Sequence, residues 1–146
     1  ICRSPMAEGL LRHYLQESEM RNRVEVSSVG TKASLPGCRP DQRAQKIAAA
    51  RGIDISGIRA RRVTARNLQR SDFIFVMDSA NMRDLLQICP VERQDKISYL
   101  LGHQAGQPLL EVPDPYFGSA DGFARVFQII DDAMADLLSY IRSRIG

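Results

Sequence analysis

The chain has 146 residues, of which 44% are hydrophobic and 25% charged, and its formal net charge at pH 7 is +3. This composition is ordinary for a soluble globular protein, and we expect a single domain over residues 1–146. No apolar run approaches the roughly 18 residues that cross a membrane, and no aromatic residues interleave the short basic run at Arg59, Arg61 and Arg62. We therefore expect neither a membrane nor a nucleic acid as partner.

The first predicted element is a helix near the start of the chain. Ser4 can cap it, and Pro5 has the fixed φ that suits a first turn. Apolar residues follow at helical spacing, namely Ala7, Leu10, Leu11 and Tyr14. Arg3 then lies just before a helix N-terminus, where unpaired backbone N–H groups favour an anion and a guanidinium can grip two phosphate oxygens.

The rest of the chain alternates between strand-like and helix-like segments, which is typical of an α/β domain with a parallel sheet. We predict strands at residues 24–29, 73–77 and 97–101. Helices are predicted at 41–51 and from a cap at Ser79 to Cys89, and a long C-terminal helix is predicted to begin after Gly118. The last helix has apolar residues at 123, 126, 127, 130, 134, 137 and 141.

The cysteines and histidines give little sign of a metal or disulfide site. The three cysteines lie far apart at positions 2, 38 and 89, which argues against a disulfide framework and a zinc cluster and favours a reducing cytoplasm. We interpret His13 and His103 as structural or surface residues. No metal and no other cofactor is expected.

Four short motifs resemble those of the low-molecular-weight protein tyrosine phosphatases. ICRSPMAEG at 1–9 is similar to the end of that family's signature loop, CxGNxCRS, and SVGT at 28–31, VMDSAN at 76–81 and VPDPYFG at 112–118 follow in the family's order. The resemblance covers the whole chain. It implies an α/β, flavodoxin-like three-layer sandwich with a four-stranded parallel sheet, whose interior first strand would precede Ile1.

The resemblance also assigns roles to the motif residues. The nucleophilic cysteine would lie six positions before Arg3, ahead of Ile1, and Cys2 matches the second loop cysteine. Arg3 would bind the phosphoryl oxygens, and the Ser4 hydroxyl would help to lower the pKa of the thiol. Asp114 matches the general acid, although DPYFG on its own is an ordinary turn sequence.

Other positions match the family's substrate cleft and its support. Ser28 matches a serine that supports the catalytic loop, and Asp78 matches an aspartate on the active-site rim, although a purely structural role is open for both. The resemblance implies that Ser34 would lie in one wall of the cleft, where many members have an aromatic residue. Tyr116 and Phe117 would form the facing wall and sandwich a phenyl ring.

The implied reaction is hydrolysis of phosphotyrosine in protein substrates through a phosphocysteine, with inorganic phosphate or a similar oxyanion held in the loop. One alternative is an arsenate reductase of the same fold. Cys89 invites that idea, but Met77 stands where the partner thiol is needed and Cys38 lies in a different loop. A second alternative is a non-catalytic phosphate-binding module, which the protein would be if it began at Ile1.

Overall fold

The computed structural model describes residues 3–31, 36–104, 106, 110–115, 118 and 120–145. Its α-helices are α1 (Arg3–Gln16), α2 (Gln42–Ala50), α3 (Ala65–Arg70), α4 (Ser79–Ile88) and α5 (Ala120–Ile145). Its strands are β1 (Ile74–Val76) and β2 (Ile97–Tyr99), and two 3₁₀ helices are η1 (Val91–Lys96) and η2 (Leu100–His103). None of the helices in the described part of the chain combines the length and apolar character of a membrane span.

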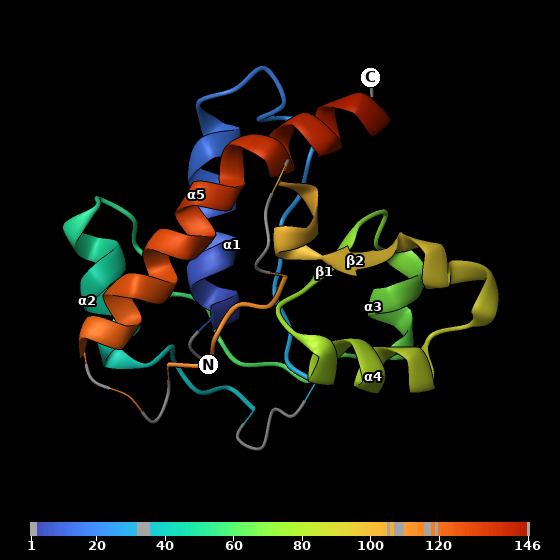
Figure 1. The fold of residues 1–146 in the computed structure, drawn as a ribbon, viewed down its shortest axis with the longest axis horizontal. Helices are drawn as coiled ribbons and strands as arrows, with labels where there is room; N and C mark the ends of the chain where they lie inside the picture. Colours follow the sequence, from blue (N-terminus) through green and yellow to red (C-terminus); the bar gives the residue numbers. More distant parts are fainter. Residues whose placement is uncertain are drawn as a thin grey trace.

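The two strands form the middle of three layers. They pair in parallel, with Ile74 opposite Ile97, and α1, α2 and α5 lie on one side of them while α3 and α4 lie on the other (Figure 1). Side chains around β1 alternate between the two sides: Phe73, Phe75 and Met77 join the larger core cluster, and Ile74 and Val76 join the smaller one. Burial on both faces explains why residues 73–77 read as a continuous apolar run.

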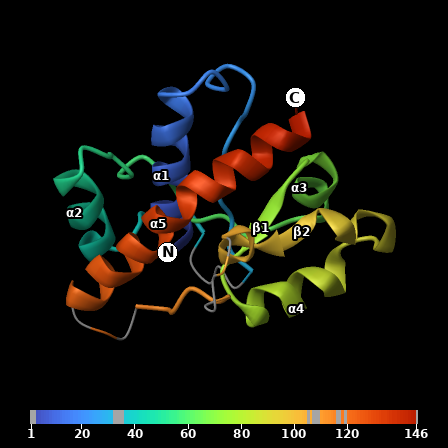
Figure 2. The same ribbon diagram turned by 45° about the horizontal axis from the view of Figure 1, so that its top comes forward.

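The larger core cluster lies where α5 crosses α1 and α2 (Figure 2). The predicted apolar spacing of the C-terminal helix is confirmed, since the buried residues of α5 include Phe123, Val126, Phe127, Ile130, Met134, Leu137 and Ile141. This long helix buries a single stripe and thereby fixes α1, which begins at Arg3.

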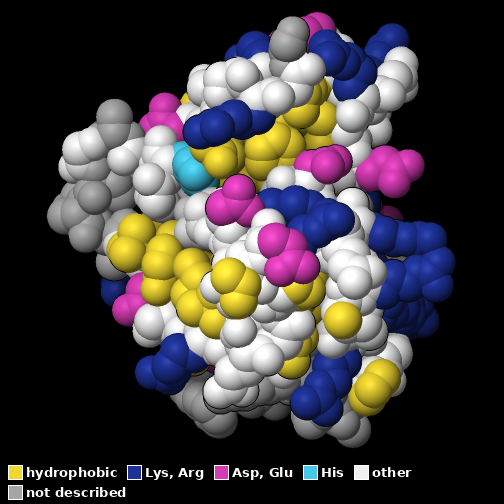
Figure 3. All heavy atoms as spheres, turned by 90° about the vertical axis from the view of Figure 1, so that its right-hand side faces the viewer, with side chains coloured by type: hydrophobic (Ala, Val, Ile, Leu, Met, Phe, Trp, Pro, Cys, Tyr) yellow, Lys and Arg dark blue, Asp and Glu magenta, His cyan; other side chains and the backbone are white. Residues whose placement is uncertain are grey.

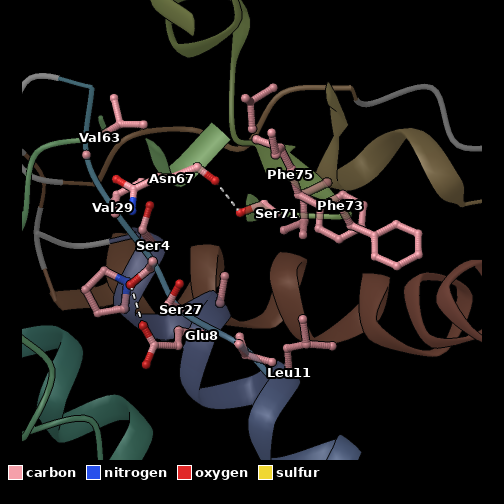
Figure 4. Close-up of a pocket in the computed structure, with 18 of the residues that line it drawn as sticks. Ser4, Glu8, Leu11, Ser27, Val29, Val63, Asn67, Ser71, Phe73 and Phe75 are labelled. Atoms are coloured by element: carbon pink, nitrogen blue, oxygen red, sulfur yellow. Dashed lines mark hydrogen bonds between the residues drawn. The ribbon is translucent and has the colours of Figure 1, made fainter. Parts of the chain in front are cut away.

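The predicted strand at 24–29 is wrong. Among the described residues, this segment contributes only the isolated parallel bridge between Gly30 and Arg62, in which the Gly30 N–H donates to the Arg61 carbonyl at 2.8 Å. A cavity of about 1110 Å³ is lined both by this segment and by β1, with Ser4 and Glu8 of α1 also on its wall (Figure 4). Paired strands lie roughly 4.8 Å apart, so a ladder cannot form across the cavity. The described sheet accordingly has two strands rather than four.

Two helix starts differ from the prediction. α1 begins at Arg3, so Ser4 lies inside its first turn and does not cap it. The cap of α4 is Asp78 and not Ser79, because the Asp78 carboxylate accepts the Asn81 N–H at 2.9 Å. The second difference places the carboxylate of the cap residue, Asp78, beside Arg3.

Other elements agree with the prediction except in length. The helix at 41–51 is confirmed as α2, with Asp41 as its cap, and the strands at 73–77 and 97–101 are confirmed as the shorter β1 and β2. The prediction missed η1, the short helix α3 and η2, whose first residues Leu100 and Leu101 were assigned to the strand at 97–101. In α3, Thr64 and Asn67 form a reciprocal capping box that a sequence search for Ser or Thr followed by Glu or Gln does not detect.

We expect Gly9→Ala to lower the free energy of unfolding by about 1–3 kcal/mol, because overpacking forces a well-packed core to shift. A Cβ at Gly9 would lie 2.5 Å from a methyl carbon of Ile55 and 3.0 Å from one of Ile53. Urea unfolding followed by circular dichroism measures the change. The matched control is Gly122→Ala in α5, where a Cβ meets no atom within 4 Å. A Gly9→Ala protein as stable as this control would contradict the packing described.

Candidate active site

The site is organised around the side chain of Arg3, at the start of α1. One guanidinium nitrogen, Nη1, donates to Oδ2 of Asp78 at 2.7 Å and to the carbonyl oxygen of Val112 at 2.8 Å. The side chain is 14% exposed, and its Nε and Nη2 donate to no other described residue. One edge of the guanidinium is therefore held by the protein, while its other donors can grip an oxyanion.

Asp78 follows β1 and performs two tasks. Its Oδ1 caps α4 through the Asn81 N–H, and its Oδ2 pairs with Arg3. Burial alone would raise the pKa of Asp78, but the hydrogen bonds from the Asn81 backbone and from Arg3 outweigh it, so the pKa is lower than usual. The carboxylate therefore stays ionised and keeps the Arg3 guanidinium in one orientation.

The segment 110–115 carries Asp114 to the same place. Val112 is buried, its N–H donates to the Met77 carbonyl at 2.8 Å, and its carbonyl accepts from Arg3. Glu111 accepts the Ser79 N–H at 2.7 Å through Oε1. These contacts fix the segment on the junction between β1 and α4. Asp114, two residues after Val112, lines the same cavity as Arg3.

The segment 24–31 is held against α1 by polar contacts. The Ser28 hydroxyl donates to Oε1 of Glu8 at 2.6 Å, and Oε2 of Glu8 pairs with Arg12 at 2.7 Å. Glu8 is only 8% exposed, and burial of such a polar side chain costs free energy unless hydrogen bonds such as these compensate for it. Sequence reasoning missed Glu8, although the four-residue spacing to Arg12 on an otherwise apolar helix face was a usable signal.

The structure brings together those predicted site residues that it describes. Arg3, Ser4, Ser28, Asp78 and Asp114 all line the cavity of about 1110 Å³, although they come from four separate segments. The other predicted residues, Ile1, Cys2, Ser34, Tyr116 and Phe117, lie outside the described residues. The arrangement can hold an oxyanion at a fixed cation and place a carboxyl group in the same cavity.

Within the described ranges, the cysteines do not lie together as a redox pair, and the residue types that bind metals do not form a metal site. Cys89 is buried, and burial raises the pKa of its thiol, whereas Cys38 is half-buried in a different segment. No group of three or more His, Cys, Asp or Glu side chains that could hold a metal ion occurs within the residues described.

A different face of the molecule, formed by α3, α4 and η1, has a mixed character. Figure 3 shows acidic, basic and apolar side chains on one face of the molecule. Leu86 and Ile88 of α4 and Val91 of η1 are exposed apolar residues.

Comparisons with known proteins agree on one family. The model of the low molecular weight phosphotyrosine protein phosphatase family matches residues 1–145. A relative of that name from Schizosaccharomyces pombe is 34% identical over 134 residues, covering 90% of this chain and 85% of the relative. A protein tyrosine phosphatase from Entamoeba histolytica superposes with a TM-score of 0.91 at 33% identity, covering 98% of this chain and 91% of the other. Vibrio vulnificus Wzb, solved with benzylphosphonate, gives a TM-score of 0.83 at 28% identity, covering 96% and 91%.

We expect Asp78→Asn to retain the cap of α4, because asparagine is an equally good cap, but to lose the ion pair with Arg3. The free energy of unfolding should fall by about 1–3 kcal/mol at neutral pH, as for the loss of a hydrogen bond between charged groups. Since folding lowers the pKa of Asp78, the stabilisation is present above the unfolded pKa of about 3.9 and is lost as the pH falls through the lower folded value.

Urea midpoints of the wild type and of Asp78→Asn, measured between pH 7 and pH 3, test this expectation. The difference in stability between the two proteins should shrink as the pH falls below about 3.9, because Asp78 is then increasingly protonated in the unfolded chain. Asp72→Asn, a change of the same kind at an exposed residue, serves as the control. A difference that stays constant across the pH range would contradict the role of the ion pair.

Proposed function

The chain belongs to the low molecular weight phosphotyrosine protein phosphatase family, and we propose that it hydrolyses phosphotyrosine in protein substrates through a phosphocysteine intermediate. The observation that carries the proposal is the contact of Arg3 with the Val112 carbonyl, which joins the phosphate-binding arginine to the segment of Asp114. An arginine and a carboxyl group that line one cavity are the two groups that this reaction needs besides a nucleophile.

We place the nucleophile six positions before Arg3, from the register of the loop motif. Its thiolate attacks phosphorus in line, the bond to the phenolic oxygen breaks, and the Asp114 carboxyl group protonates the departing oxygen. A water molecule then attacks the phosphorus of the phosphocysteine, and the Asp114 carboxylate takes its proton. The phosphorus–sulfur bond breaks, which regenerates the thiolate and releases inorganic phosphate. Ser4 supports the thiolate in this proposal, since its side chain lines the cavity from the first turn of α1.

Arg3 has the role of stabilising the equatorial oxygens of the transferring phosphoryl group. Two neighbours hold its Nη1, so the guanidinium is already oriented before substrate binds. Asp78 is a positioning residue in this scheme. Ser28 is a supporting residue that acts through Glu8, because its hydroxyl donates to that carboxylate.

The substrate specificity is part of the proposal. Ile1 and Cys2 would contribute to the phosphate-binding loop, and Ser34, Tyr116 and Phe117 would line the walls around the phenyl ring. Vibrio vulnificus Wzb, a relative solved with benzylphosphonate, supports an aryl group beside the phosphoryl group. The cytoplasmic location stays a prediction.

We also propose that a strand preceding Arg3 pairs with β1 on one side and with residues 24–29 on the other. Residues 24–29 form no strand among the described residues and would become one only through this pairing, which would give a four-stranded sheet. The cavity is lined by both of these segments, and unpaired backbone groups at such a position need hydrogen-bond partners. A strand there would lead directly into the loop before α1.

The arsenate reductase alternative is disfavoured, because the buried Cys89 has a raised pKa and is a poor redox partner.

We expect Arg3→Lys to lower kcat/KM for a phosphotyrosine peptide by at least about 100-fold in the full-length protein, because a point charge cannot replace the two-pronged contact. Circular dichroism should show an unchanged fold. Arg66→Lys at an exposed position of α3 is the control and should act like the wild type. A folded Arg3→Lys protein whose kcat/KM lies within about tenfold of the wild-type value would contradict the role assigned to Arg3.

We expect Asp114→Asn to slow phosphotyrosine hydrolysis by about 100-fold or more, the usual scale for loss of a general acid. An aryl phosphate whose phenol is already acidic should be affected much less, and substrate binding should change little. The measurement is single-turnover phosphorylation of the enzyme with a series of leaving groups. If both proteins depend equally on the pKa of the phenol, Asp114 is a turn residue and not the acid.

A further inference from the structure

Glu111 makes a contact that its exposed position does not require. Its carboxylate accepts the backbone N–H of Ser79, the first residue of α4, although the two residues lie 32 positions apart in the sequence. The first N–H groups of a helix have no partner inside the helix, and a carboxylate near them is also favoured by the helix dipole. Glu111 therefore fastens its own segment to the N-terminus of α4.

The same helix end also holds Arg3. Asp78, the cap of α4, pairs with the Arg3 guanidinium at 2.7 Å, and Ser79 is the next residue. Asp78 and Ser79, which are adjacent in the chain, thus hold two different segments of the site. Asp78 holds Arg3 of α1, and Ser79 holds the segment of Glu111. The Val112 carbonyl, which accepts from Arg3, completes the connection between them.

The chain between Glu111 and Asp114 is stiff. Pro113 and Pro115 flank Asp114, and each proline has a fixed φ. Each also restricts the residue before it, and those residues are Val112 and Asp114. The backbone between Glu111 and Asp114 therefore has few free rotations, and the contact of Glu111 adds to the contacts of Val112 with Met77 and Arg3 in placing Asp114.

We propose that Glu111 is a positioning residue that keeps the segment of Asp114 in register with Arg3 through its contact with the Ser79 N–H. The inference rests on the proposed phosphatase function, in which Asp114 must reach the leaving oxygen. Glu111 itself has no contact with the phosphoryl group in this scheme. Its effect on the reaction is confined to the placement of the proton donor.

The charge of Glu111 suits this task. The hydrogen bond from the Ser79 backbone is the largest influence on Glu111 and lowers the pKa of its carboxyl group. The side chain therefore remains ionised at neutral pH, where the enzyme would act. Because the acceptor is a single oxygen, a glutamine at this position can still accept the same N–H.

The experiment compares Glu111→Ala with Glu111→Gln in the full-length protein, using single-turnover phosphorylation by a phosphotyrosine peptide and by p-nitrophenyl phosphate. We expect Glu111→Ala to slow the peptide reaction about 5- to 20-fold and the p-nitrophenyl phosphate reaction less than about twofold, since only the basic leaving group needs the proton. Glu111→Gln should stay within about twofold of the wild type for both. Glu92→Ala, an exposed change in η1, is the matched control.

Amide hydrogen exchange at Ser79 gives a readout that does not depend on activity. The exchange should accelerate in Glu111→Ala and stay unchanged in Glu111→Gln. Equal slowing of both substrates by Glu111→Ala, no slowing of either, or a Gln variant as slow as the Ala variant would overturn the inference. A wild-type protein that hydrolyses neither substrate would instead overturn the proposed function, and this inference with it.

Discussion

The hydrogen bonds of the Arg3 guanidinium are the contact on which the site depends. One nitrogen joins α1 to Asp78 at the end of β1 and to Val112 in the segment before α5. A cation that is only 14% exposed has to be paired, and both partners come from segments far away in the sequence. Closing the fold around α1 therefore assembles the site at the same time, and the phosphate-binding group and the acid segment are placed together.

The layered fold explains why these partners are available. In open parallel sheets, ligands bind beyond the carboxyl ends of the strands, where chain segments turn into helices. Met77 and Asp78 follow β1 there, the first fixing the Val112 N–H and the second capping α4. The cap, the ion pair and the segment of Asp114 thus share one corner of the molecule. A polar side chain that stabilises the helix also orients the arginine.

Much of this could be predicted from the sequence, but the contacts between segments could not. Apolar spacing located α1, α2, α4 and α5, and motif resemblance singled out Arg3, Asp78 and Asp114. The pattern at 24–29 predicted a strand because the alternation of apolar and polar residues reports only a local preference. A strand also needs a neighbouring strand to pair with. Among the described residues, this segment lines a cavity. The contacts of Glu8 with Ser28 and of Glu111 with Ser79 join distant positions, and no local pattern records such pairs.

The most direct measurement is a crystal structure of the full-length protein with vanadate, which adopts the geometry of a transferring phosphoryl group. We expect Nε and Nη2 of Arg3 to donate to equatorial oxygens, while Nη1 remains on Asp78 and Val112. The Asp114 carboxyl group should lie beside one apical oxygen, opposite the cysteine sulfur. Vanadate bound away from Arg3, or an Arg3 side chain that leaves Asp78 to reach it, would contradict the central claim.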